Sequence, residues 1–196
     1  MTYNPRDHYF RKAKQENFAA RSVFKLEEID QKFKIFRGVK TVLDLGASPG
    51  SWSQYASKVV GDHGRVLGVD LSPVTVKLKN AVFIQADLRD LNLEDIFKEH
   101  GFLPPFDIVM SDMAPKTTGI RMTDQARSME LCELALDVAR RFLKKDGHFV
   151  CKLFHSDDFS KLRDEMKRVF QKVEAVKPDS TRKISKEIFL VGITKK

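Results

Sequence analysis

Cysteine is scarce in this sequence, and the two cysteines lack the spacing of metal ligands. Cys132 and Cys151 are the only ones among 196 residues. They fall in segments that are predicted to be a helix and a strand, which favours buried free thiols over disulfides or a zinc site. We therefore expect a reducing compartment and no metal.

Long apolar runs are also missing. No stretch is long enough to span a bilayer, and residues 1–8 lack the apolar core of a signal peptide. Internal repeats, low-complexity tracts and interdomain linkers are absent as well. With 42% hydrophobic and 32% charged residues, the composition is typical of a globular protein. We expect one domain over residues 1–196 that is cytoplasmic, monomeric and without a membrane partner.

The charge is unevenly distributed along the chain. The net charge is +8, with ten Lys/Arg against five Asp/Glu in residues 1–40 and eleven against five in residues 160–196. Residues 41–159 hold fourteen Lys/Arg against seventeen Asp/Glu. A basic surface attracts phosphate backbones, although a generic solubilising surface explains the charge equally well. The distribution gains meaning only if the two ends meet on one face.

Apolar segments alternate with helical patterns along most of the chain. The clearest helices are predicted over 124–145 and 158–170, the first closed by Lys144, Lys145 and a Gly147 cap. A further helix is expected over 17–33, within an N-terminal segment 16–36, after a basic segment 1–15 that is expected to be mobile. Seven strands are predicted: residues 41–47, 65–71, 82–87, 106–113, 148–154, 173–177 and 187–194.

This alternation predicts an α/β fold with helices on both faces of a mostly parallel sheet. Residues 178–186 leave room only for a loop, so the last strand is expected to return antiparallel. Such a seven-stranded sheet resembles the Rossmann-like fold of S-adenosylmethionine-dependent methyltransferases.

The turn after the first strand is rich in small residues. Residues 42–53 read VLDLGASPGSWS, an apolar strand that leads through a turn into a helix. Such a turn lets a ligand approach the backbone, and a helix N-terminus offers N–H groups to an anion. Gly46, Ser48 and Ser51 occupy the glycine positions of the dinucleotide fingerprint, so two of its three glycines are missing. The turn therefore favours S-adenosylmethionine over NAD, with Gly46 as a contact.

Carboxylates follow three of the predicted strands. Asp70, Asp87 and Asp112 stand where the second, third and fourth strands end, at the edge where ligands of open parallel sheets bind. Each alone is more simply a helix cap or a turn aspartate. Three together behind a small-residue turn favour a nucleoside site, with Asp70 placed for ribose hydroxyls and Asp87 for the adenine amino group.

Two motifs make the sequence more specific. DLGASPGSWS at 44–53 and SDMAP at 111–115 resemble the FtsJ-type ribosomal RNA 2′-O-ribose methyltransferase family. The resemblance extends from RSVFKLEEI at 21–29 to KEIFLV at 186–191. It departs at Ser48, where family members commonly have alanine, and we expect no functional change from this small residue.

The resemblance implies a catalytic tetrad and a set of cofactor contacts. The family's Lys-Asp-Lys-Glu tetrad falls on Lys25, Asp112, Lys152 and Glu187. Its S-adenosylmethionine contacts fall on Gly50, Trp52, Asp70, Asp87 and Asp112. It further implies methylation of a uridine in large-subunit (23S) ribosomal RNA, within the large ribosomal subunit, with S-adenosylhomocysteine as product.

Part of the tetrad is supported by the residues themselves. Lys152 interrupts an apolar strand at the centre of the sheet, where an unpaired lysine is costly, and the neighbouring strand ends in Asp112. Lys152 could instead extend from the strand end to solvent, and Lys25 could be a solvated helix lysine. The sequence leaves open whether Lys152 acts as a general base or as a fixed cation beside a developing alkoxide.

The basic ends would then border the site and hold RNA phosphates, with affinity falling steeply as salt is added. The candidates for this contact are Arg11, Lys12, Lys14, Arg21, Arg182, Lys183 and Lys186.

Other functions remain open at this stage. A nicotinamide-dependent oxidoreductase shares the fold but is disfavoured by the missing glycines and the SDMAP stretch. A non-catalytic RNA-binding module would explain the charge but not the tetrad. Within the methyltransferases, the alternative substrates are a ribose of a transfer RNA anticodon loop and, after it, an mRNA cap ribose.

Overall fold

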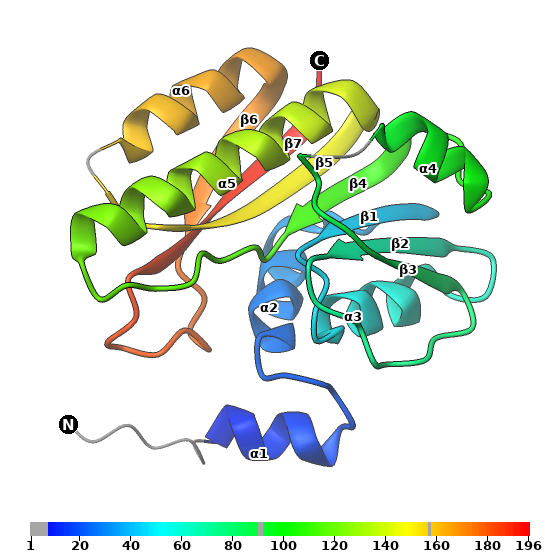
Figure 1. The fold of residues 1–196 in the computed structure, drawn as a ribbon, viewed down its shortest axis with the longest axis horizontal. Helices are drawn as coiled ribbons and strands as arrows, with labels where there is room; N and C mark the ends of the chain where they lie inside the picture. The colour runs from blue at the N-terminus through cyan, green and yellow to red at the C-terminus, as the bar shows by residue number, and fades with distance from the viewer. Residues whose placement is uncertain (1–7, 90–91, 157) are drawn as a thin grey trace.

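The structure, a computed structural model, describes residues 8–89, 92–156 and 158–196 (Figure 1). Its helices are α1 (His8–Gln15), α2 (Val23–Phe33), α3 (Ser51–Val60), α4 (Leu93–Glu99), α5 (Arg121–Phe142) and α6 (Phe159–Val169). Its strands are β1 (Thr41–Leu45), β2 (Arg65–Asp70), β3 (Ala81–Gln85), β4 (Phe106–Ser111), β5 (Leu143–Phe154), β6 (Phe170–Val176) and β7 (Glu187–Lys195). All seven predicted strands are confirmed.

The strands form one sheet in the order β3-β2-β1-β4-β5-β7-β6. The strands from β1 to β5 pair in parallel, and β7 runs antiparallel between β5 and β6. The predicted α/β fold with a reversed last strand is therefore confirmed. The order changes direction between β1 and β4, so their carboxyl ends leave a crevice there.

Helices cover both faces of the sheet (Figure 1). Side chains alternate along a strand, so Val42 of β1 packs with α2 and α3, while Leu43 packs with α4, α5 and α6. Each face of the sheet buries its own apolar cluster, which makes the central strands apolar almost throughout. None of the helices in the described residues is long and apolar enough to cross a membrane.

The end of α5 differs from the prediction. The helix stops at Phe142, and Leu143 is already extended and paired with Phe106. Gly147 is no helix cap, because it lies within β5, where a Cβ atom would come within 2.9 Å of the Asp107 carbonyl oxygen. The predicted helix end at Lys144, Lys145 and Gly147 was therefore wrong, and the close approach to β4 explains the glycine.

The N-terminal segment differs as well. The helix expected over 17–33, within the segment 16–36, covers only Val23–Phe33, and residues 8–15 form the separate helix α1. Asn17 has a left-handed φ of 58°, which interrupts the helix. The Gln54 side chain then holds this connection, by accepting from Ala19 N and donating to Asn17 O. The predicted mobility of segment 1–15 falls partly on residues 1–7, outside the described residues.

Candidate functional site

A cavity of about 380 Å³ opens at the carboxyl ends of β1, β2, β3 and β4. Its polar lining includes three of the predicted carboxylates, Asp70, Asp87 and Asp112. Lys152 of β5 also lines it. The apolar lining comes from Val69, Leu71, Ala86, Leu88, Met113, Ala114, Leu131 and Leu134. This combination of apolar walls and convergent carboxylates fits a nucleoside whose hydroxyl and amino groups need acceptors.

Asp70 fixes the small-residue turn beside the cavity. Its two carboxylate oxygens accept from Ser48 N at 2.9 Å and Ser72 N at 2.7 Å. Gly46, with φ of 77°, lines the cavity against Met113, whose backbone N would lie 2.9 Å from any Cβ at this position. Glycine is required there both by conformation and by space.

Asp87 is held by a neighbouring arginine. The Arg89 guanidinium donates to both Asp87 oxygens, at 2.5 Å from Nη2 and 2.9 Å from Nε. The hydrogen bonds from Arg89 lower the pKa of Asp87 to about 2, so this carboxylate is ionised at neutral pH. Arg89 was not predicted, although a basic residue two positions after a candidate carboxylate is visible in the sequence.

Gly50 and Trp52 lie outside the cavity lining. A Cβ at Gly50 would meet Val76 and Val74, so the segment after β2 covers this glycine. Trp52 is buried, donates from Nε1 to Ser22 O at 3.0 Å and packs against Phe189. Its side chain therefore joins α3 to α2 and β7. The cofactor contact expected of both residues stays a prediction.

Lys152 is buried and ion-paired in the lining of the cavity. Its side chain crosses from β5 to the end of β4, where Nζ lies 2.8 Å from Asp112 Oδ1 and donates to Asp112 O at 2.6 Å. Only 7% of Lys152 is exposed, so Asp112 supplies the opposite charge and a carbonyl acceptor for this buried ammonium.

Lys25 and Glu187 form the second ion pair of the site. Lys25 of α2 is 9% exposed, and its Nζ donates to Glu187 Oε2 at 2.5 Å. Glu187 opens β7 opposite Phe154, two residues beyond Lys152 on β5. Burial raises the pKa of Glu187, but the cations Lys25 and Lys152 outweigh burial and lower it below its ordinary value. The four predicted side chains therefore form one continuous charged cluster.

A further acid lies beneath this site. Asp44 of β1 is fully buried, and its Oδ2 accepts from Ser53 Oγ at 2.5 Å, while Oδ1 has no hydrogen-bond partner. Burial raises the pKa of Asp44 to about 7, and the charges of Asp112 and Asp70 raise it further against the hydrogen bond from Ser53. The sequence displays Asp44 in the DLG motif, but only the structure distinguishes it from the carboxylates that line the cavity.

Asp44 predicts a specific pH dependence of stability. The folded protein binds this proton more tightly than the unfolded chain, whose carboxyl has a pKa near 3.8. The free energy of unfolding should therefore fall as the pH rises from about 4 to about 7, by up to about 1.4 kcal/mol per pH unit from this group. Asp44→Asn should remove that slope, as measured by urea unfolding of both proteins between about pH 4 and about pH 7. Equal slopes in the two proteins would contradict the assignment.

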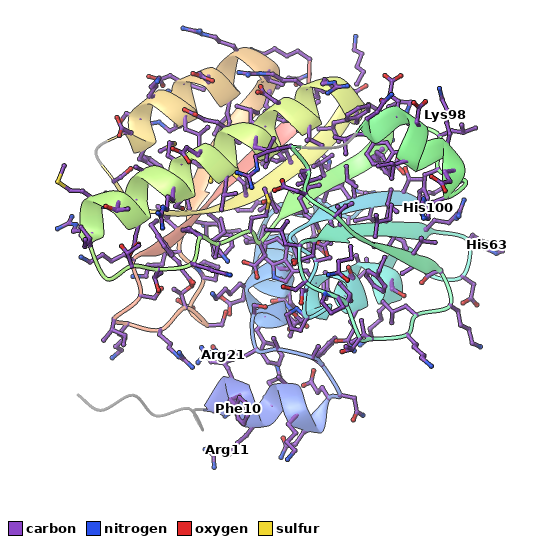
Figure 2. The ribbon with its side chains drawn as sticks, in the orientation of Figure 1. Phe10, Arg11, Arg21, His63, Lys98 and His100 are labelled. Atoms are coloured by element: carbon purple, nitrogen blue, oxygen red, sulfur yellow. The ribbon has the colours of Figure 1, made fainter. Side chains whose placement is uncertain are left out.

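The two basic ends of the chain do meet. Glu28 of α2 accepts from Asp179 N at 2.6 Å and Ser180 N at 3.0 Å, in the loop before β7. Arg21 donates from Nη2 to Ser180 O at 2.5 Å, and its guanidinium lies over the Tyr9 ring. Figure 2 shows Arg21 between α1 and the rest of the molecule.

The predicted RNA contacts differ in how free they are to bind phosphate. Arg21 is engaged in holding the loop, and Lys12 lies over the Phe24 ring with Glu16 at 3.8 Å. Arg11 projects from α1 away from the rest of the molecule (Figure 2). Lys14, Lys183 and Lys186 are exposed and Arg182 is partly exposed. An RNA contact by these seven residues stays a prediction.

Sequence reasoning missed the cavity residues that come from α5. Leu131 and Leu134 line the cavity from this helix. Their spacing of three residues marks one helix face, but the pattern does not show which side chains reach the ligand edge of the sheet.

Known proteins resemble this chain over its full length. It is 91% identical, over 196 residues that cover all of both chains, to "Ribosomal RNA large subunit methyltransferase E" of Bdellovibrio bacteriovorus. It is 49% identical over 195 residues, 98% of each chain, to the protein of that name in Syntrophobacter fumaroxidans.

Solved structures share the fold. A ribosomal RNA methyltransferase from Plasmodium falciparum superposes with a TM-score of 0.77 at 26% identity, covering 91% of this chain and 98% of that one. Fibrillarin from Aeropyrum pernix, crystallised with S-adenosyl-L-methionine, superposes with a TM-score of 0.59 at 16% identity, covering 80% of this chain and 66% of that one. The model of the FtsJ-like methyltransferase family matches residues 18–195. With this match, and with its fold and relatives, the chain belongs to the FtsJ-like methyltransferase family.

Proposed function

We propose that this chain transfers the methyl group of S-adenosylmethionine to the 2′-hydroxyl of a uridine ribose in large-subunit (23S) ribosomal RNA. The observation that carries the proposal is the buried Lys152, which is paired with Asp112 in the cavity lining and interacts electrostatically with Glu187 of the Lys25–Glu187 pair. The names of the relatives from Bdellovibrio and Syntrophobacter support ribosomal RNA as the substrate.

The cavity residues fit the proposed cofactor. Asp70 would accept from the ribose hydroxyls, since each of its carboxylate oxygens takes one hydrogen bond and keeps a second lone pair. Asp87 would accept from the adenine amino group in exchange for part of its contact with Arg89, which donates twice to each of its oxygens. The apolar walls from Leu88, Leu131 and Leu134 would pack against the adenine ring. S-adenosylmethionine supplies a methyl group that its sulfonium has already activated. The protein has therefore to orient the attacking oxygen and handle one proton.

The tetrad residues would divide this work. Lys152 would act at the 2′-oxygen, either by removing its proton or by stabilising the negative charge that develops there. Asp112 contacts the Lys152 ammonium through its carboxylate Oδ1 and its backbone carbonyl oxygen. The two contacts limit the rotation of the ammonium. Glu187, ionised and held by Lys25, would position the ribose beside Lys152. We further propose that the protein acts as a monomer on RNA within the large ribosomal subunit.

Mapping of 2′-O-methylation tests the proposal. Ribosomal and transfer RNA from cells with and without this protein would be compared position by position, using resistance to alkaline cleavage at methylated riboses. One large-subunit uridine should lose its 2′-O-methyl group in cells without the protein. Loss in the anticodon loop of a transfer RNA instead would favour the alternative substrate, and an unchanged map in both RNAs would refute the proposal.

A further inference from the structure

Three large aliphatic side chains are exposed at the start of α5 and in the loop before β7, on either side of the strand end that carries Lys152. Ile120, Met122 and Ile184 are 64%, 81% and 69% exposed. Ile120 and Met122 lie where α5 begins, and Ile184 lies in the loop between β6 and β7. Exposed apolar groups that gather within a polar surface commonly mark a contact site.

Ile120 also contradicts local preference. It is the N-cap residue of α5 and makes no side-chain cap hydrogen bond. Ser, Thr, Asp or Asn is preferred at this position, and an aliphatic residue gives up that stabilisation. A position that breaks a local rule without benefit to the fold points to a function.

The loop that carries Ile120 is fixed. The Asp124 carboxylate, which is 9% exposed, accepts from Thr118 N at 2.7 Å, Thr118 Oγ1 at 2.9 Å and Gly119 N at 3.2 Å. These hydrogen bonds hold residues 118–120 against the first turn of α5. Ile120 is therefore presented to solvent by an ordered loop.

The loop that carries Ile184 is fixed as well. Glu28 and Arg21 contact the first half of this loop. In its second half, Ser185 O accepts from Lys177 Nζ at 2.8 Å. Ser185 N donates to Arg182 O at 2.9 Å, which closes a turn around Ile184.

The end of β5 brings these two loops together. His155, three residues after Lys152, donates from its backbone N to Lys186 O at 3.0 Å and accepts at its carbonyl from Gln125 Nε2 at 2.5 Å. The first turn of α5 and the loop before β7 therefore flank the strand end that carries Lys152. Figure 1 shows both loops at the same end of the sheet.

The surroundings of the three side chains are basic. Residues 114–127 and 177–186 together hold seven Lys or Arg and two Asp. One of these acids, Asp124, is already occupied by its own loop. A partner with an anionic backbone and flat apolar groups matches this surface, and single-stranded RNA with unstacked bases has both.

We propose that Ile120, Met122 and Ile184 form an aliphatic cradle that holds the target base and its neighbour out of the RNA stack, so that the target ribose lies at Lys152. This inference rests on the proposed function for the identity of the RNA. The basic residues of the two loops bind phosphate, and the cradle contributes a contact that does not depend on salt.

Ile120→Ser gives the sharpest test, because it should move stability and RNA affinity in opposite directions. Serine caps the helix better than isoleucine, so the melting temperature should stay unchanged or rise. The Kd for a large-subunit ribosomal RNA transcript, from filter binding, should increase about fivefold, as expected when one aliphatic contact is lost. The triple variant I120S/M122S/I184S should bind the transcript with a Kd about 100-fold higher than that of the unmodified protein.

Two controls separate the effect of the cradle from the loss of any exposed apolar side chain and from the loss of phosphate contacts. Leu103, which is 77% exposed in the loop that enters the opposite end of β4, offers the matched variant Leu103→Ser. It should bind RNA as the unmodified protein does. The double variant K183A/K186A should flatten the dependence of log Kd on log salt, whereas the triple variant should weaken binding at every salt concentration with the slope unchanged.

The outcomes are distinct. The cradle is refuted if the triple variant binds the transcript within twofold of Leu103→Ser. It is also refuted if the triple variant loses activity only on isolated large subunits while its affinity for the bare transcript is unchanged, since the contact would then be with a protein. Failure of the unmodified protein to form 2′-O-methyl groups would overturn the proposed function and leave this binding comparison valid.

Discussion

Replacing Lys152 with alanine is expected to lower the rate of methyl transfer about 100- to 10,000-fold, because in the proposed function the Lys152 ammonium is the group that acts on the 2′-oxygen. Methyl incorporation from labelled S-adenosylmethionine measures the rate, and calorimetry measures cofactor affinity, which should change little. Lys152→Arg separates the two roles that remain open. Arginine keeps the positive charge but does not accept a proton, so substantial activity would favour a fixed cation and loss of activity would favour a base.

The same two strands provide a matched control. Lys144 of β5 pairs with Asp107 of β4 at 2.5 Å. This pair lies where the two strands begin, whereas Lys152 and Asp112 lie where they end. Lys144→Ala therefore removes a more exposed ion pair between the same two strands, away from the cavity, and should leave the rate of methyl transfer unchanged. A Lys152→Ala enzyme with the turnover of Lys144→Ala would end the proposed mechanism.

Asp112→Asn should have the second largest effect, with kcat about 100-fold lower and the KM for S-adenosylmethionine about tenfold higher. The change keeps the shape of the side chain but removes the charge that compensates the buried Lys152 ammonium. It also removes a carboxylate from the cavity lining, and for that reason both kinetic constants should respond. Steady-state kinetics with cofactor and RNA varied separately would measure them.

Asp107→Asn is the control for this variant. It weakens the pair with Lys144 and the hydrogen bonds that Asp107 accepts from Lys40 N and Thr41 N. Unfolding should become easier in this control, while both kinetic constants stay the same. An Asp112→Asn protein that loses stability but retains kcat would show that Asp112 serves only the fold.

The order of elements was predictable because periodicity is a local property. Each strand combines apolar residues with bounding turn residues, and the short segment 178–186 excludes a helix, so the reversed β7 follows from chain length alone. Boundaries that depend on tertiary contact were not predictable. The end of α5 is decided by the pairing of Leu143 with Phe106, which is distant in sequence.

The site was predictable to a similar degree. The family motifs pointed to the four charged side chains that form the two ion pairs, and the sheet order brings Lys152 beside Asp112. The sequence did not indicate that Arg21 would be engaged in a backbone contact, because this depends on where Ser180 lies. Nor did it indicate that Val74 and Val76 would cover Gly50, since the path of a loop over a turn leaves no periodic pattern.

The pairing of Lys25 with Glu187 joins residues that are 162 positions apart. During synthesis, every residue that lines the cavity has been added by the time Lys152 is reached. Lys25, made long before, still lacks its anion at that point and gains it only when β7 enters the sheet. A nascent chain whose last strand is still inside the ribosomal exit tunnel therefore holds every residue of the cavity lining but lacks the carboxylate that pairs with Lys25.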